Sequence, residues 1–169
     1  MLHKMIDLNK LQIIPAEKTD AAVLTNIAFS AKRHWPYPES YFNTWQCELT
    51  ITQDYIAAHT IYKIITDNTI AGFYSIVNNT KDFCSGEVFV QKGFWLEHIF
   101  IRPEYHHQGM GRLLIQHAKQ IAKSKGIDAL LIFVDPYARV FYDKIGADFL
   151  HESKSSIPER MIPVYRLKT

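Results

Sequence analysis

The residues with the clearest potential for chemistry are two glycines directly before a helix-like segment. Gly109-Met110-Gly111 is followed by Arg112 and then by apolar residues at helical spacing. Glycines at a strand-to-helix turn let backbone N–H groups approach a ligand, and a helix N-terminus carries about half a positive charge. Arg112 adds a full charge at the same place. The range 107–112 therefore predicts a phosphate or pyrophosphate site, although a tight turn that needs glycine for its dihedral angles produces the same pattern.

Two common phosphate-binding motifs do not fit this turn. A P-loop places Gly-Lys-Ser/Thr at the helix start, whereas Gly111 is followed by Arg112 and Leu113. A Rossmann fingerprint needs a third glycine where the chain has Leu114, and it opens a series of strand-helix-strand units early in the chain. These exclusions leave a phosphate-bearing cofactor in a mixed sheet.

The elements around the turn follow from the apolar pattern. Residues 94–101 are predicted to form a strand that ends before Pro103, and apolar side chains recur at helical spacing from Leu113 to Ala122. Residues 129–134 are an unbroken apolar run, typical of a strand covered on both faces. Strand, glycine turn, helix and strand together predict a right-handed crossover.

The rest of the chain predicts an antiparallel sheet with further helices. Strands are expected at 11–14, 60–66 and 70–77, then near 149–150 and at 164–167, with an irregular extension at 83–91. Helices are expected from residue 21 up to a break at 32–38, then at 39–49, at 52–56 and at 137–145. The expected order is β-α-α-β-β-β-α-β-α-β-β, which is an α/β (α+β) fold with a mixed, mostly antiparallel sheet.

Composition restricts the class of protein. The chain has 169 residues, 47% of them hydrophobic, and its 19 Lys+Arg against 17 Asp+Glu leave a charge of +2. We expect one domain over residues 1–169 that does not bind nucleic acid, because a nucleic-acid binder concentrates basic charge.

No apolar run approaches the ~20 residues that span a membrane, and the first seven residues lack a signal-peptide pattern, so we expect a cytoplasmic protein. Neither Cys47 and Cys84 nor the eight histidines show metal-ligand spacing, and we expect no metal.

Two motifs together resemble the GNAT (Gcn5-related N-acetyltransferase) superfamily. Residues 99–114, IFIRPEYHHQGMGRLL, are similar to its central Arg/Gln-x-x-Gly-x-Gly/Ala motif, with His106 where Arg or Gln is usual. Residues 135–147, DPYARVFYDKIGA, are similar to its Asn-x-x-Ala-x-x-Phe-Tyr-x-x-x-Gly-Phe segment, with Asp135 in place of Asn and Ala147 in place of Phe. The resemblance covers about the whole chain, and the segments at 32–35 and 156–163 resemble a bacterial subgroup.

The resemblance implies a GNAT fold whose strands 94–101 and 129–134 splay apart and hold acetyl-CoA, without a metal. Pantetheine would pair with the backbone of 99–101, and a free N–H near Phe100 or Ile101 would polarise the thioester carbonyl. Histidine at 106 is expected to present its backbone N–H to the pyrophosphate. The cofactor-binding residues implied are Ile99, Phe100, Ile101, His106, His107, Gln108, Gly109, Met110, Gly111, Arg112, Asp135 and Tyr142.

The resemblance also identifies candidate catalytic groups. Tyr142 stands at the Phe-Tyr of the second motif, and a phenol of pKa ~10 can protonate a departing thiolate, since a thiol has a pKa of ~8.5. An amine acceptor must first lose its own proton, and Glu97 and His98 lie on the strand that leads to the cofactor. Side-chain alternation predicts that only one of them faces the acceptor directly. We favour Glu97 as the base, with His98 or a water relay as alternatives.

The acceptor is less well defined. By the resemblance, the loop after the first helix lines its site through Lys32, His34, Trp35 and Tyr37, and the tail at 155–163 forms a lid or closes the sheet edge. The reaction implied is direct acetyl transfer to a primary amine of a small molecule, peptide or protein. A non-catalytic acetyl-CoA sensor is the alternative, and the resemblance also admits a homodimer.

Overall fold

The computed structural model describes residues 11–169. The expectation about a signal peptide concerns residues outside this range. The helices are α1 (Ala21–Arg33), α2 (Glu39–Leu49), α3 (Gln53–Ala58), α4 (Met110–Ser124) and α5 (Arg139–Lys144), with short 3₁₀ turns η2 (Lys18–Asp20), η3 (Pro103–Tyr105) and η4 (Pro136–Ala138). The strands are β1 (Gln12–Pro15), β2 (Thr60–Thr66), β3 (Thr69–Asn79), β4 (Phe83–Ser85), β5 (Val88–Val90), β6 (Gly93–Ile101), β7 (Ala129–Phe133), β8 (Asp148–Lys154) and β9 (Met161–Lys168).

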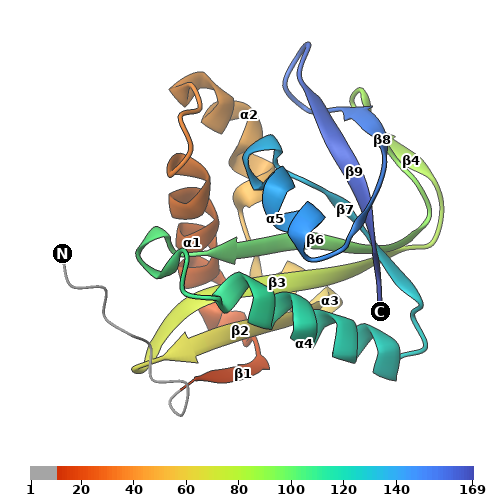
Figure 1. Ribbon diagram of the computed structural model, residues 1–169. Helices are drawn as coiled ribbons and strands as arrows, with labels where there is room; N and C mark the ends of the chain where they lie inside the picture. The colour runs from red at the N-terminus through yellow and green to blue at the C-terminus, as the bar shows by residue number, and fades with distance from the viewer. Residues whose placement is uncertain (1–10) are drawn as a thin grey trace.

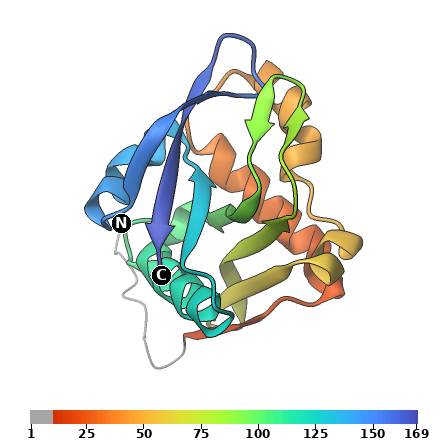
Figure 2. The ribbon, with the colours of Figure 1, turned by 90° about the vertical axis from the view of Figure 1, so that its right-hand side faces the viewer.

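Seven strands form one sheet in the order β1-β2-β3-β6-β7-β9-β8 (Figure 1). The β6–β7 pair is parallel and α4 connects its two strands, whereas the other neighbouring pairs are antiparallel. The predicted mixed, mostly antiparallel α/β sheet is therefore confirmed. Strands β4 and β5 form a separate hairpin that rises beside β8 and β9 in Figure 2, where the sequence predicted only an irregular extension.

Helices cover both faces of the sheet, and each face has its own apolar core. On one face α1, α2 and α3 pack on β2 and β3 around Leu24, Trp45 and Phe73, and Phe100 of β6 belongs to this side. On the other face α4 and α5 pack on the centre of the sheet, where Leu114 of α4 is fully buried. The helices therefore approach β6 from opposite sides (Figures 1 and 2).

Most elements agree with the sequence pattern, and the differences have local causes. Strand β8 extends over seven residues where only 149–150 were expected, because its side chains are largely exposed and show no apolar alternation. Helix α3 runs to Ala58, two residues further than expected, and Thr52 caps it by accepting a hydrogen bond from the Tyr55 N–H at 3.0 Å. Within residues 11–169, no helix is long and apolar enough to cross a membrane.

Candidate active site

The centre of the sheet opens between its two parallel strands. In the described part of the chain, the β6–β7 pairing consists of Trp95 against Leu131, while β6 stays paired with β3 up to Ile101. The following residues of β6 therefore have one free edge. The splayed pair expected from the resemblance lies at this place.

The free edge of β6 presents particular backbone groups. The N–H of His98 donates to Ser75 Oγ at 3.1 Å, and that of Arg102 donates to the Ala71 carbonyl at 2.8 Å, so both point toward β3. Successive N–H groups of a strand point to opposite edges. The N–H groups of Ile99 and Ile101 therefore point toward the opening, whereas that of Phe100 points toward β3. Of the two candidates for the thioester contact, the geometry favours Ile101.

The glycine turn presents a run of unbonded backbone donors. Among residues 11–169, none of the N–H groups at 107–112 donates to a backbone carbonyl or a side chain, and the first bond of α4 runs from Leu113 N–H to the Gly109 carbonyl at 3.1 Å. Gly109 has φ +82°, a left-handed conformation that glycine adopts without strain. These unbonded N–H groups and the exposed Arg112 are the features that favour an anion at a helix N-terminus.

His106 does not take part in this run as expected. Its backbone N–H donates to the Pro103 carbonyl at 3.1 Å, within a 3₁₀ turn that proline initiates. The expectation that His106 presents its N–H to a pyrophosphate is therefore wrong. Its imidazole Nε2 instead donates to the Ile101 carbonyl at 3.0 Å, and burial lowers its pKa. The side chain thus bonds to the end of β6, next to the glycine turn.

Tyr142 lies on α5, which packs against the first turn of α4. A Cβ at Gly111 would stand 3.4 Å from the Phe141 ring, so the absence of a side chain there permits this close packing. Tyr142 is 4% exposed, and burial raises its pKa well above the usual range, with Asp135 adding to the effect. Its hydroxyl has no hydrogen-bond partner among residues 11–169. Because no fully buried polar atom in that range lacks a partner, the hydroxyl keeps some exposed surface.

Glu97 and His98 lie on the same side of the sheet, contrary to the alternation prediction. Ser75 pairs with His98 and Ile76 pairs with Leu96, which leaves Glu97 in a β-bulge. The extra residue shifts the alternation, so both side chains reach the Tyr55 hydroxyl of α3. The prediction that alternation places the two side chains on opposite faces is therefore wrong.

A hydrogen-bond network connects the two candidate bases. The Tyr55 hydroxyl donates to Glu97 Oε2 and lies 2.9 Å from His98 Nδ1 and 2.8 Å from Ser75 Oγ. His98 Nε2 lies 2.9 Å from the Glu48 carbonyl, which can only accept, so Nε2 carries the proton and Nδ1 is an acceptor. Glu97 is 45% exposed and His98 is 11% exposed. The carboxylate therefore faces solvent, and the imidazole stands behind it.

His98 makes stability depend on pH. Burial lowers its pKa, against the pull of Glu97, so the unfolded chain binds this proton more readily than the native protein. The free energy of unfolding should therefore fall as the pH drops below about 7, since an unfolded histidine titrates near pH ~6.5. His98→Gln should reduce the slope by up to about 1.4 kcal/mol per pH unit in urea unfolding between pH 7 and 5. His151→Gln, on an exposed strand, is the control, and equal slopes in wild type and His98→Gln would contradict the assignment.

The predicted acceptor residues meet the second motif at the end of β7. Asp135 accepts hydrogen bonds from Lys32 Nζ, from the Tyr37 hydroxyl at 2.7 Å and from the Tyr137 N–H at 3.0 Å. Burial favours the neutral form of Asp135, but these three donors outweigh it and hold its pKa below the usual range. Trp35 stacks on the Tyr137 ring at 5.1 Å. Lys32, Trp35 and Tyr37 are thus brought together around the motif.

His34 extends the same loop to the glycine turn. Its ring contacts the His106 ring edge-on, with the centroids 4.7 Å apart. The loop at 34–37 therefore touches the end of β6 through His106 and the end of β7 through Tyr137. It spans the open end of the splayed pair.

Residues 24–147 match a family described as Acetyltransferase (GNAT) family, and this range is more than half of the chain. The chain belongs to this family. The resemblance noted from the sequence is confirmed, and the GNAT family is one of N-acetyltransferases. The splayed strands and the glycine turn both lie within the matched range.

Known proteins are similar to this chain in part of the sequence or in fold. An uncharacterized N-acetyltransferase, ycf52-like, of Prochlorococcus marinus is 32% identical over 63 residues, which are 37% of this chain and 34% of that protein. The chain thus spans about a third of the length of this curated relative.

Solved structures extend the likeness over the whole fold. A GCN5-related N-acetyltransferase from Rhodopseudomonas palustris superposes with a TM-score of 0.73 at 17% identity, covering 97% of this chain and 98% of that one. The PaiA N-acetyltransferase from Thermoplasma acidophilum, in complex with coenzyme A, gives 0.71 at 19% identity, with 94% and 99% covered. At sequence identities this low, the superpositions establish the fold of the chain and nothing more.

Proposed function

We propose that this chain is a cytoplasmic N-acetyltransferase of one domain, residues 1–169, that transfers the acetyl group of acetyl-CoA directly to a primary amine. The observation that carries the proposal is the opening between β6 and β7, with unbonded N–H groups at 107–112 beside it and the N–H groups of Ile99 and Ile101 facing it. The first set suits a pyrophosphate, and the second suits a pantetheine arm and a thioester carbonyl.

The family membership and the coenzyme A held by the Thermoplasma relative support acetyl-CoA as the cosubstrate. Acetyl-CoA, when bound, supplies the thioester. Arg112 and the backbone at 107–112 would hold its phosphates. The residues present suit this group, because the donors are backbone N–H groups on a rigid turn and one exposed guanidinium.

In the proposed mechanism, the base and the acid stand on opposite faces of the sheet and meet through the opening. Glu97 and Tyr55 lie on the side of α3, and Glu97 takes the proton of the ammonium group, directly or through water. Ile101 N–H stabilises the oxyanion that forms when the amine attacks the carbonyl carbon. As the C–S bond breaks, Tyr142, on the side of α4 and α5, donates its hydroxyl hydrogen to the departing thiolate sulfur. The second proton of the attacking nitrogen leaves as the amide forms and returns through water to the Tyr142 oxygen, which restores the phenol. Cys47 and Cys84 are exposed and outside this site, so no acyl-enzyme is invoked.

Acetyl-CoA binding and turnover are the direct tests. At a hundredfold excess over its Kd, acetyl-CoA should stabilise the fold by about 2.7 kcal/mol and raise the Tm by about 5–10 °C. A panel of primary amines should then release CoA thiol in proportion to acetylated product. Absence of a Tm shift at saturation would contradict the cofactor site, and a shift without thiol release for any amine would indicate a sensor.

Two glycines that flank α4 provide a matched pair for this binding test. Gly109 and Gly126 stand at opposite ends of the helix with φ +82° and +71°, and an added Cβ meets nothing within 4 Å at either. Alanine should strain the backbone similarly at both positions. Only Gly109→Ala should weaken acetyl-CoA binding, because only strain at residue 109 displaces the unbonded N–H groups at 107–112.

A further inference from the structure

Arg160 lies where the β8–β9 turn crosses the acceptor loop. Its guanidinium donates to the Tyr37 hydroxyl at 2.9 Å and lies 5.2 Å from the Tyr37 ring centroid and 5.4 Å from that of Trp45. Lys32 Nζ lies 4.6 Å from the centroid of the same Trp45 ring. Lys32 and Arg160 therefore both contact the Trp45 ring, at the end of the sheet where Lys32 and Tyr37 bind Asp135.

The turn that carries Arg160 is rigid and anchored. Ser155 Oγ accepts a hydrogen bond from the Ile157 N–H at 3.1 Å, and the Ser155 N–H donates to the Arg160 carbonyl at 3.0 Å. Ile157 is 5% exposed and packs with Trp45 in the core under α1 and α2. These contacts anchor the backbone at Arg160, and the Tyr37 hydroxyl accepts a hydrogen bond from its guanidinium.

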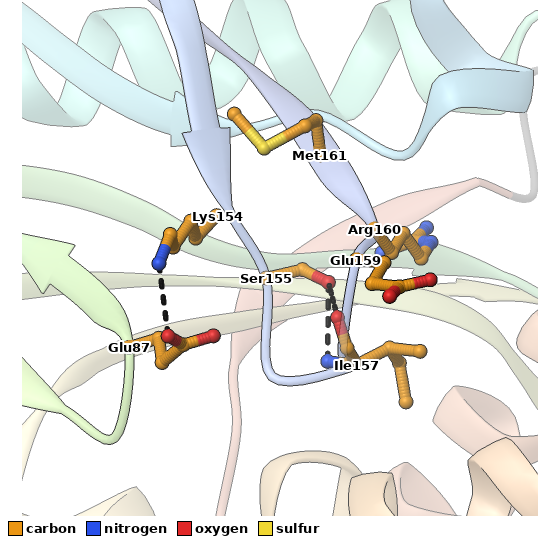
Figure 3. Close-up of a pocket in the computed structure, with 7 residues that line it drawn as sticks. All are labelled: Glu87, Lys154, Ser155, Ile157, Glu159, Arg160 and Met161. Atoms are coloured by element: carbon orange, nitrogen blue, oxygen red, sulfur yellow. Dashed lines mark hydrogen bonds and ion pairs between the residues drawn. The ribbon is translucent and has the colours of Figure 1, made fainter.

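Open space lies beside this turn. A cavity of about 220 Å³ lies between it and the β4–β5 hairpin, and Arg160 is one of its lining residues. Figure 3 shows Arg160 and Glu159 projecting from one side of the turn and the Lys154–Glu87 ion pair, 2.8 Å long, on the other side. A small molecule can therefore approach the turn that carries Arg160.

Of the two cations beside Trp45, Lys32 and Arg160, only Lys32 is paired with a carboxylate. Asp135 forms an ion pair with Lys32, and Glu48 adds a weaker attraction to the same lysine. Arg160 forms no ion pair with any carboxylate of residues 11–169. Arg160 is partly buried, and its guanidinium holds several N–H donors in a planar fork. Because burial removes part of its hydration and no carboxylate replaces it, this guanidinium attracts an anionic ligand.

We propose that Arg160 binds a carboxylate of the acceptor, so that the substrate is an amino acid or another amine that bears a carboxylate. This inference rests on the proposed function. Helix α2 runs between the places proposed for the two ends of such a substrate. Its Trp45 ring contacts Lys32 and Arg160. One turn further along α2, the Glu48 carbonyl accepts a hydrogen bond from His98, beside Glu97. The carboxylate would lie against Arg160 and Tyr37 while the amine lies toward Glu97.

Matched acceptor pairs test the inference. Each pair joins an amino acid to the amine that lacks its carboxylate: phenylalanine with phenethylamine, lysine with cadaverine, and β-alanine with ethylamine. In at least one pair, kcat/KM for the carboxylate-bearing acceptor should exceed that of its partner by about ten- to hundredfold. Arg160→Gln should bring this ratio close to one, mainly through KM, and Arg160→Lys should restore part of it.

Arg166→Gln is the control, because Arg166 also lies near this end of the chain but forms a surface ion pair with Asp148. It should keep the wild-type ratio. The Tm and the acetyl-CoA shift of each variant show whether the turn stays folded. Ratios near one for all pairs in a wild type that acetylates amines would overturn the inference and leave the proposed function standing. A ratio kept by folded Arg160→Gln would also overturn it, whereas no acetylation of any amine would reject the proposed function itself.

Discussion

Tyr142→Phe is expected to lower kcat by about 10²- to 10³-fold while leaving the Kd of acetyl-CoA within about twofold, because it removes one donor aimed at charge that develops in the transition state. The hydroxyl makes no hydrogen bond to the rest of residues 11–169, so its removal leaves no protein group unpaired. Burial raises the pKa of Tyr142, which keeps the phenol neutral at working pH. The phenol therefore acts by donating a hydrogen bond to the thiolate as it forms, and the proton follows as CoA leaves.

Tyr165→Phe is the control for this prediction. The Tyr165 ring lies 6.1 Å from that of Tyr142 in the same core, but its hydroxyl donates to Asp143 at 2.6 Å. It should reduce the Tm and leave kcat close to wild type. Single-turnover measurements of thiol release compare the variants at the chemical step. Equal single-turnover rates in Tyr142→Phe and wild type would remove Tyr142 from the chemistry.

The layout of the sheet could be predicted because its signals are local. The apolar run at 129–134, the stripe of α4 and the glycines at 109 and 111 each specify an element from neighbouring residues alone. The sequence predicts the β4–β5 hairpin only as an irregular extension and β8 only as a short strand near 149–150, because their side chains are largely exposed and their pairing depends on tertiary contacts.

The candidate site could be predicted as far as single motifs define it. The positions of the donor run and of Tyr142 follow from two contiguous segments. The bulge at Glu97 could not be read from the sequence, because it arises from the register of β6 against β3, in which Ser75 and Ile76 pair with His98 and Leu96. One extra residue in that register places two side chains on the same face.

Partners from distant elements carried no sequence signal at all. Tyr55 lies 42 residues before Glu97 in the chain, and Arg160 lies 123 residues after Tyr37. The sequence alone predicts only that Tyr55 lies in a helical turn and that Arg160 lies in a segment that forms a lid or closes the sheet edge. The structure shows that this segment packs across α1 and α2 through Ile157.

Glu97→Gln is expected to reduce kcat/KM by about 10²- to 10³-fold at neutral pH with a primary amine of pKa ~10. The amide keeps the size of the side chain but cannot accept the ammonium proton. Tyr55, which donates to the Glu97 carboxylate, positions this group, so Tyr55→Phe should cause a smaller loss, of about tenfold. Glu152→Gln, at an exposed ion pair with Arg139, is the matched control and should keep wild-type kcat/KM.

The pH dependence separates a base from a residue that merely holds the site together. As the pH rises toward the amine pKa, a growing fraction of the acceptor arrives already deprotonated and no longer needs Glu97. The ratio of wild-type to Glu97→Gln kcat/KM should therefore shrink steadily between pH 7 and pH 10. A purely structural role would leave the ratio constant, since the defect would then not depend on the proton of the acceptor. The same pH profile for His98→Gln identifies the base. If the loss of kcat/KM in His98→Gln shrinks as the pH rises and the loss in Glu97→Gln does not, the role assigned to Glu97 is wrong. The imidazole then takes the proton through Tyr55.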